Sequence, residues 1–267
     1  MLSFLVSGLR AGLRGRSFHA VFVLGILLLF VALLSGSFSP RQPRTVAMDI
    51  GLSGMRITLV LLQLIWIQEL VAKEIERKTI LHSLAYPIPR HVFLLGRYSA
   101  VLVLGALAAL ILGLGLLSAV IIAGKGYSQE FPVDLGIPYW ITIFGIALDA
   151  AVVTSVGLAI SSVSTVSVMP LAVGLVFAVS GKALGATIAY LAGGADGDPL
   201  LTQTFNPIID VIRWIVPDLS RLDWRYWPMY GLQPETAHLV WAMVMAISYI
   251  VVAIALALAL FRHREFS

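Results

Sequence analysis

The sequence predicts an all-α integral membrane protein with six transmembrane helices. Of its 267 residues, 59% are hydrophobic and only 12% are charged, which is about half the charged fraction of a typical soluble domain. The mean hydropathy is +0.95. A soluble fold of this length needs charged side chains over most of its surface, and this chain has too few of them. The composition therefore excludes an ordinary cytosolic enzyme and a disordered chain.

Charge and cysteine content exclude further classes. The 18 Lys and Arg residues leave a net charge of only +4 and are not gathered into one stripe, so nucleic acid is not expected as a partner. The absence of cysteine excludes a disulfide framework, an iron–sulfur site and a thiol nucleophile. The five histidines lack the spacing of metal ligands, so we predict no metal site.

The first half of the chain contains three stretches that can each cross about 30 Å of hydrocarbon as a helix. Residues 18–37 lack charge, and their apolar core is longer than that of a signal peptide, so we expect a retained helix. Residues 51–71 form the second predicted span, with Arg56 and Glu69 near its ends. Residues 98–123 form the third and carry no formal charge.

The second half of the chain contains three more predicted spans. The apolar stretch from 138 to 191 is too long for one helix, and its serine-rich run at 161–167 divides it in two. We therefore predict spans at 138–160 and 166–191. The last span is predicted at 238–261.

The distribution of charge predicts the orientation in the membrane. Ten Lys and Arg residues fall before the first span, in the 73–97 loop and in the C-terminal tail, whereas six fall in the other connections, together with nine of the acidic residues. Loops rich in Lys and Arg face the cytoplasm. We therefore expect both termini and the 73–97 loop to be cytoplasmic and the 193–237 connection to be extracytoplasmic.

The loop at 73–97 combines a charged beginning with a short amphipathic pattern. Ile80, Leu81 and Leu84 recur at helical spacing. Pro87 and Pro89 end that short helix and favour an extended turn. The pattern suits a helix that docks a soluble partner, and it suits a solvated connection equally well.

Three short runs in this loop resemble the loop after the second helix of type-2 ABC exporter permeases. They are Glu-Arg-Lys-Thr-Ile at 76–80, Leu-Ala-Tyr-Pro-Ile-Pro-Arg at 84–90 and Leu-Gly-Arg at 95–97. The chain departs from the family pattern at Lys78, where Gly is usual, and at Arg97, where Lys is usual. In that family the loop is the coupling element that sits in a groove of the ATP-binding subunit.

Two other regions extend the resemblance over the whole chain, 1–267, as a single permease domain. The run Trp-Ile-Val-Pro-Asp-Leu-Ser-Arg-Leu-Asp at 214–223 resembles a segment before the last helix of many such permeases. The amphipathic stretch from Met1 to Arg16 resembles the elbow helix of the family. The resemblance thus implies an N-terminal elbow helix, a cytoplasmic coupling helix and short extracytoplasmic helices before the last span.

The resemblance implies that the chain is the membrane-spanning subunit of an ATP-driven exporter in the bacterial inner membrane. It also implies two ABC ATP-binding subunits, which bind ATP and Mg, and a second permease copy, either identical or a close paralogue. The chain itself lacks a P-loop, because Gly124-Lys125 and Gly181-Lys182 have neither the hydroxyl residue nor the upstream glycine. We therefore expect no bond chemistry and no cofactor on this chain. The implied docking residues for the ATPase subunit are Glu74, Glu76, Arg77, Lys78, Thr79, Leu81, Leu84, Pro87, Pro89 and Arg90.

Two ionisable residues are predicted deep in the membrane, where such groups are costly and usually face a partner or a cavity. Asp149 lies about 16 Å below the outer end of its predicted span, and Lys182 lies at a similar depth. We expect these two residues to pair or to share a polar cavity. In the alternative, Lys182 snorkels outward and Asp149 bonds to a nearby hydroxyl such as that of Thr154.

Other polar and aromatic residues have simpler interpretations. Arg56 and Glu69, near the ends of the second span, are expected to snorkel to the membrane surface. The aromatic residues of the outer connection are expected to form an interfacial belt, although a substrate-binding platform is an alternative. They are Trp214, Trp224, Tyr226, Trp227 and Tyr230.

Three other functional classes remain open. The Gly-Leu-Ser-Gly run at 51–54 has the form of the nucleophile motif of rhomboid proteases, but Ser53 lies in the second span and His238 lies at a helix mouth. A secondary transporter needs several membrane acids and inverted repeats, whereas only Asp149 qualifies. A scaffold that transmits ATP-driven force to a periplasmic partner has the same sequence features as an exporter.

Overall fold

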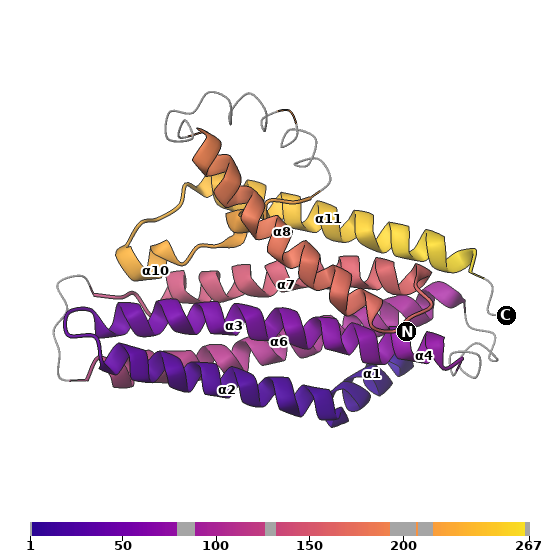
Figure 1. Cartoon of the computed structure of the whole chain (residues 1–267), viewed down its shortest axis with the longest axis horizontal. Coiled ribbons are helices and arrows are strands. Elements are labelled where there is room, and N and C mark those ends of the chain that lie inside the picture. Colours follow the sequence, from indigo (N-terminus) through magenta and orange to yellow (C-terminus); the bar gives the residue numbers. More distant parts are fainter. Residues whose placement is uncertain (1, 79–88, 126–131, 193–206, 208–215, 265–267) are drawn as a thin grey trace.

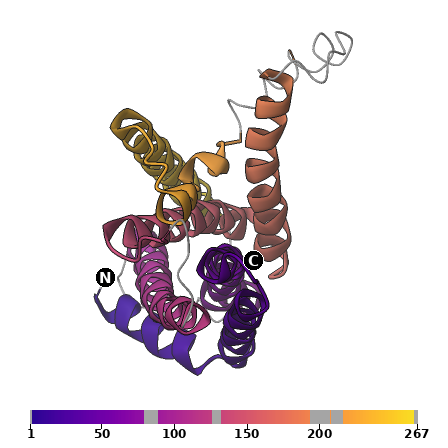
Figure 2. The same cartoon turned by 90° about the vertical axis from the view of Figure 1, so that its left-hand side faces the viewer.

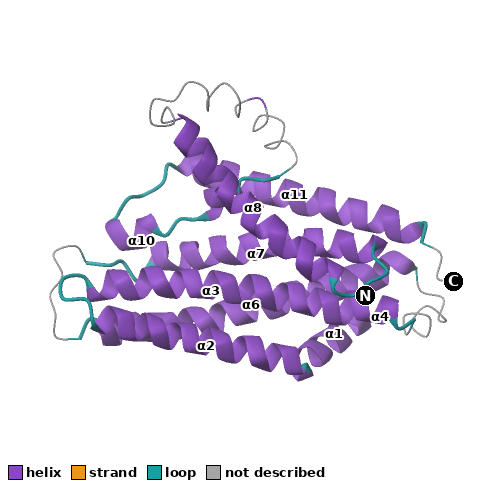
Figure 3. Ribbon diagram, in the orientation of Figure 1, coloured by secondary structure: helices purple, strands orange, loops and turns teal. Residues whose placement is uncertain are grey.

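The computed structural model describes residues 2–78, 89–125, 132–192, 207 and 216–264, and within these ranges all regular secondary structure is helical (Figure 3). Six of the helices are long and apolar enough to cross a membrane. This confirms the predicted all-α, multi-pass membrane protein. The six candidate spans are Phe18–Ser37, Pro43–Glu76, Arg90–Ala123, Ile137–Val163, Met169–Ile188 and Thr236–Arg262.

Four helices form one bundle: α2 (Arg16–Ser37), which is mostly exposed, and the more buried α3 (Pro43–Ile67), α6 (Arg90–Ala123) and α7 (Ile137–Val163). They pack side by side, as the end-on view in Figure 2 shows. Both ends of the described chain lie at one end of this bundle, here called the terminal side (Figure 1). The opposite end, where α2 is joined to α3, is called the distal side.

The first helix, α1 (Leu2–Arg14), lies across the terminal side and packs against α6. Gly8 and Gly12 allow this close approach, since an added Cβ at Gly12 would lie 2.5 Å from Leu104 of α6. The indole nitrogen of Trp66 donates a hydrogen bond to the carbonyl of Gly12 over 3.1 Å. The amphipathic N-terminal stretch is therefore fixed to the bundle along one face.

Two spans begin earlier than the sequence predicted. Helix α3 begins at Pro43, eight residues before the expected start, because proline is well suited to the first turn of a helix, where its missing N–H costs nothing. It continues through a π-helical turn, η1 (Gln68–Ala72), into α4 (Lys73–Glu76). Helix α6 begins directly after Pro89. Both predictions placed the start where hydropathy rises rather than where the backbone becomes helical.

Helices α8 (Met169–Ala192) and α11 (Thr236–Arg262) flank the central bundle. Helix α8 packs on α3 and α7 near its beginning and then diverges from the bundle, as Figures 1 and 2 show. Helix α11 packs mainly along α7. Most of the surface of α8 and α11 is exposed and apolar, as expected for helices that contact lipid or another membrane protein.

A distal segment, residues 216–231, connects toward α11 and is seated among α3, α7 and α8. It contains a 3₁₀ turn, η3 (Leu219–Leu222), and a short helix, α10 (Tyr226–Tyr230). Leu219 and Leu222 are fully buried. The Thr142 hydroxyl of α7 donates a hydrogen bond of 3.2 Å to the carbonyl of Trp224. The segment is thus part of the packed core on the distal side.

Candidate functional site

Three charged residues from three helices meet inside the bundle. Asp149 of α7 is completely buried, and its Oδ2 lies 3.3 Å from Nε of Arg56 on α3. The same oxygen lies 3.5 Å from Nζ of Lys182 on α8. The two residues expected to pair, Asp149 and Lys182, are therefore close together, and Arg56 forms a second ion pair with the same carboxylate.

The distal segment completes the cluster. Asp223 accepts hydrogen bonds from Arg56 and from Arg225, the latter over 2.9 Å. Arg225 also donates to Asp49 over 2.8 Å and to the hydroxyl of Ser53 over 2.9 Å. Cations and carboxylates thus alternate through a chain of ion pairs that we call the charge network. In order, it comprises Lys182, Asp149, Arg56, Asp223, Arg225 and Asp49.

The charge network is balanced in charge but incompletely hydrogen-bonded. Three cations face three carboxylates, which makes burial of these groups feasible in a low-dielectric interior. Within the described ranges, however, neither carboxylate oxygen of Asp149 has a hydrogen-bond partner, and Nη2 of Arg56 has none either. The Thr154 hydroxyl, an alternative partner for Asp149, donates instead to the carbonyl of Ala150. Asp149 therefore depends on its two ion pairs.

The position of Arg56 contradicts one prediction from the sequence. The expectation that it snorkels to the membrane surface is wrong, because it is only 4% exposed and lies between two carboxylates. Since α3 begins at Pro43, Arg56 lies about 20 Å from the distal end of its helix. The expected aromatic belt also needs a correction at Trp224, which is buried.

The network predicts a specific loss of stability in acid. Burial disfavours the charged form of Asp223, but the hydrogen bonds and charges of Arg225 and Arg56 outweigh it and lower the pKa of Asp223 to about 2. Because this value lies below the ordinary pKa of about 3.9, the stabilisation is full above that value and is lost as the pH falls toward 2. We expect the wild-type chain to lose about 2 kcal/mol more than the Asp223→Asn variant between about pH 5 and pH 2.

This prediction is checked by unfolding the purified protein in detergent across that pH range. The exposed Glu235 provides a control, since Glu235→Gln should leave the acid sensitivity of the wild-type chain unchanged. Equal acid sensitivity in the wild-type chain and in Asp223→Asn would contradict the structural assignment of Asp223.

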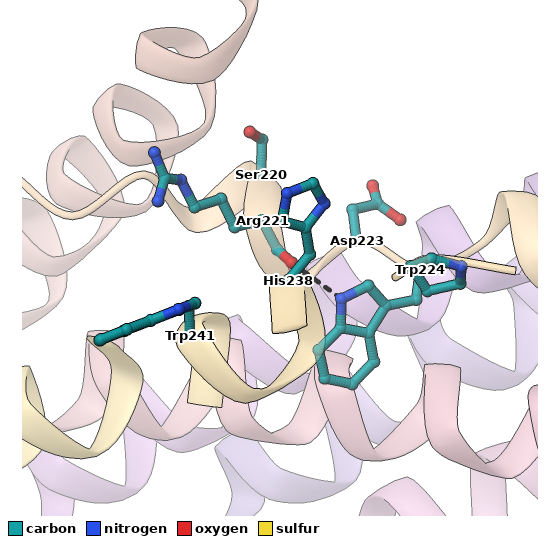
Figure 4. Close-up of a pocket in the computed structure, with 7 residues that line it drawn as sticks. Ser220, Arg221, Asp223, Trp224, His238 and Trp241 are labelled. Atoms are coloured by element: carbon teal, nitrogen blue, oxygen red, sulfur yellow. Dashed lines mark hydrogen bonds between the residues drawn. The ribbon is translucent and has the colours of Figure 1, made fainter. Parts of the chain in front are cut away.

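A pocket on the distal side lies between the distal segment and the beginning of α11 (Figure 4). It has a volume of about 440 Å³. Trp224 donates a hydrogen bond to the carbonyl of Arg221 over 2.8 Å, and His238 and Trp241 face the same space from α11. The side chains of Arg221, His238 and Trp241 are mostly exposed, so this pocket is more accessible to solvent than the charge network.

The second candidate region is the entry to the 73–97 loop on the terminal side. Glu76, Arg77 and Lys78 are exposed there, whereas Glu74 is half-buried. Lys78 has a φ of +56°, the left-handed conformation that glycine adopts without strain at the end of a helix. This explains in physical terms why glycine suits this position in the permeases that the loop resembles. Thr79, Leu81, Leu84 and Pro87 lie outside the described residues.

Arg97 joins the two ends of this loop. Its guanidinium donates to the carboxylate of Glu74, at the beginning of the 73–97 loop, and to the hydroxyl of Ser7 on α1 over 3.3 Å. Arg97 itself is buried at the beginning of α6. A lysine has no planar fork with which to hold two partners in fixed directions. The arginine therefore ties α1, α4 and α6 together at one point.

Near the C-terminal end of the 73–97 loop, Arg90 is hydrogen-bonded to the C-terminal tail. Arg90 donates a hydrogen bond of 2.9 Å to the carbonyl of Arg264. The Arg264 side chain in turn donates to the carbonyls of Ser161, Ser162 and Ser164 at the end of α7. A cation at this position satisfies the last carbonyls of a helix and complements its dipole. The terminal ends of α6, α7 and α11 thus form one bonded unit.

Neither candidate region has the composition of a metal centre. Across the described part of the chain, no three His, Asp or Glu side chains are grouped so that they could hold a metal ion. Comparison with models of known protein families and with curated proteins found no match.

Proposed function

We propose that the chain is the membrane-spanning subunit of an ATP-driven ABC exporter in the bacterial inner membrane. In this proposal two copies of the chain, or the chain and a close paralogue, assemble with two separate ATP-binding subunits that hold ATP and Mg. Both termini and the 73–97 loop face the cytoplasm, so the terminal side of the bundle is the inner side. The chain transmits force and catalyses no reaction itself.

The observation that carries this proposal is the junction at Arg97. The loop whose sequence resembles the coupling element of these permeases is bracketed by Glu74 and Arg97, and these two residues are joined by an ion pair. Such a pair is only partly exposed and has little freedom, so a displacement of the loop moves both flanking helices together. Ser7 adds α1 to the same junction.

The proposed mechanism follows from this connection. Closure of the ATP-binding subunits pushes on the coupling loop, and the junction passes the displacement to α1, α3 and α6. The charge network lies farther along α3, where Arg56 joins α7 and the distal segment. Movement of α3 along its axis therefore acts on the distal segment, which lies on the outer side in the proposed topology.

The docking role is tested by copurification with an ATP-binding-cassette protein encoded next to this chain. Wild-type protein is expected to retain that partner, and Glu76→Arg or Leu84→Asp should reduce retention at least about tenfold, as expected for residues central to an interface. Lys125→Glu, an exposed charge change on the distal side, is the matched control and should retain the partner.

Two outcomes would contradict the docking role. Full retention of the ATP-binding protein by both loop variants would show that it binds elsewhere. Failure of the wild-type chain to retain any ATP-binding protein would remove the basis of the exporter proposal.

A force-transmitting scaffold for a periplasmic partner is the second candidate, because it uses the same junction and the same coupling loop. Transport of substrate in reconstituted vesicles separates the two, since a scaffold hydrolyses ATP with its partner subunit and moves nothing. The intramembrane protease is less well supported. The Ser53 hydroxyl accepts its hydrogen bond from Arg225, whose guanidinium cannot accept the proton of a nucleophile.

A further inference from the structure

Two hollows meet at the charge network. The first, here called the polar pocket, has a volume of about 410 Å³ and is lined by Ser53, Arg56, Lys182, Asp223 and Arg225, among others. The second, here called the apolar groove, has a volume of about 220 Å³ and runs between α3 and α8. Arg56, Ile57 and Lys182 line both of them. The apolar part of the groove comprises Val60, Leu61, Leu175, Ala178 and Val179.

The groove leads from the polar pocket toward the terminal side of the bundle. On α3, Val60 and Leu61 lie about one turn beyond Arg56 in the direction of the terminal side. Helix α8 runs the opposite way, so Leu175 and Val179 lie on that same side of Lys182. The combined space is thus polar at its distal end and apolar below.

The groove is open along its side. Ile57 is 55% exposed and Val179 is 68% exposed, so an apolar chain in the surrounding bilayer can enter between the two helices. Each CH₂ group of such a chain that lies against this wall adds apolar contact area.

The lining of the polar pocket contains more cations than carboxylates, although the charge network as a whole is balanced. Three cations and one carboxylate line it, whereas Asp149 lies behind the wall with no exposed surface and Asp49 does not line it. Lys182 keeps a third of its side chain exposed. A phosphate group placed here meets the ammonium group of Lys182 and the partly exposed guanidinium of Arg225, and such donors bind phosphate well.

We infer that the polar pocket and the apolar groove together bind one lipid with an anionic phosphate headgroup. Its headgroup lies in the polar pocket and an acyl chain lies in the apolar groove. This is the orientation of a lipid in the leaflet on the distal side, which is the outer leaflet in the proposed topology. The binding itself rests on the two hollows and does not require the transport function proposed above.

The test uses the full-length chain purified in detergent and native mass spectrometry to count bound lipids. The probes are phosphatidylglycerol and phosphatidylcholine with identical acyl chains, mixed in equal amounts. We expect about fivefold higher retention of the anionic lipid, and Lys182→Gln should abolish most of this preference while Lys182→Arg restores it. Lys125→Gln, at an exposed position just after the distal end of α6, is the control for charge.

A second variant tests the groove without altering the charge network. Val179→Trp places a large side chain at the exposed mouth of the groove and should reduce retention of the anionic lipid about fivefold. Val252→Trp on α11, at a similarly exposed position, is its control and should retain the lipid.

Three results would overturn the inference. They are equal retention of the two lipids, unchanged preference in Lys182→Gln, and a change from dimer to monomer in Val179→Trp, which would show that a second copy covers the groove. Equal retention of the two lipids by the wild-type chain, together with normal retention of the ATP-binding protein, would reject this inference and leave the proposed function standing.

Discussion

Replacement of Arg56 by methionine is expected to lower the free energy of unfolding by about 3–5 kcal/mol. Methionine occupies much of the same volume, so the loss is one of charge rather than of packing. Arg56 forms ion pairs with both Asp149 and Asp223. Without it, the completely buried Asp149 retains a single ion pair, with the more exposed Lys182.

The measurement is the unfolding of the purified protein in detergent, compared between variants at neutral pH. Arg221→Met is the matched control, because Arg221 is 62% exposed and contacts only Asp218 among charged groups of the described chain; its effect should stay within about 0.5 kcal/mol. A loss of less than about 1 kcal/mol in Arg56→Met would contradict the buried ion pairs.

A double variant distinguishes the cost of leaving one partner of the buried ion pair unpaired from the cost of replacing the side chains themselves. Combining Arg56→Met with Asp149→Leu removes both members of one buried pair and leaves no unpaired carboxylate at that point. Such pairs are often replaced by apolar residues at little cost, so the double variant should be more stable than the sum of the two single losses predicts. Simple additivity would show that the two residues do not interact.

The sequence predicted the helices well because hydrocarbon imposes a minimum apolar length that composition reveals directly. The run of serines at 161–167 located the break between α7 and α8, which are separated by residues 164–168. The depth of Asp149 and Lys182 in their spans also indicated that the two groups meet. Depth is a one-dimensional quantity, and a helix rise of about 1.5 Å per residue suffices to estimate it.

The rest of the charge network could not be predicted from hydropathy. Arg56 was placed near a helix end because the apolar stretch begins at about residue 51, whereas the helix begins at Pro43. Its partner Asp223 lies 167 residues away in a polar connection, and nothing in the local pattern shows that this connection packs into the bundle. The one available signal was the pair of leucines, Leu219 and Leu222, three residues apart in an otherwise polar run.

The reverse holds for the 73–97 loop. Its charges and prolines are evident in the sequence, yet the pattern alone did not separate Glu74 from Glu76. The structure distinguishes them, since Glu74 contacts Arg97 while Glu76 is exposed. Sequence position along a helix fixes the face of each side chain only relative to its neighbours, so the partner of Glu74 required knowledge of where α6 begins.

The second large loss of stability is expected at Gly145, the residue of α7 against which the distal segment packs. Gly145 lies on α7 directly beneath this segment, and an added Cβ would lie 2.7 Å from the carbonyl oxygen of Leu222 and 2.9 Å from the ring of Trp224. Since the nearest atom belongs to the backbone, no side-chain rotation can relieve the contact, and the segment itself must move. We expect Gly145→Val to lower the free energy of unfolding by about 3 kcal/mol, at the upper end of the range for overpacking.

Displacement of the segment has a local consequence that a general loss of stability does not produce. The chain after Arg221 and after Arg225 should become more accessible to trypsin, because the backbone of the segment leaves the packed surface of the bundle, and Asp223 should lose its contact with Arg56. Gly145→Val and Arg56→Met should then be less than additive when combined. Gly115→Val on α6 is the matched control, since its added Cβ meets only the flexible end of Leu29. Equal trypsin sensitivity in the two glycine variants would show that the distal segment is not seated on Gly145.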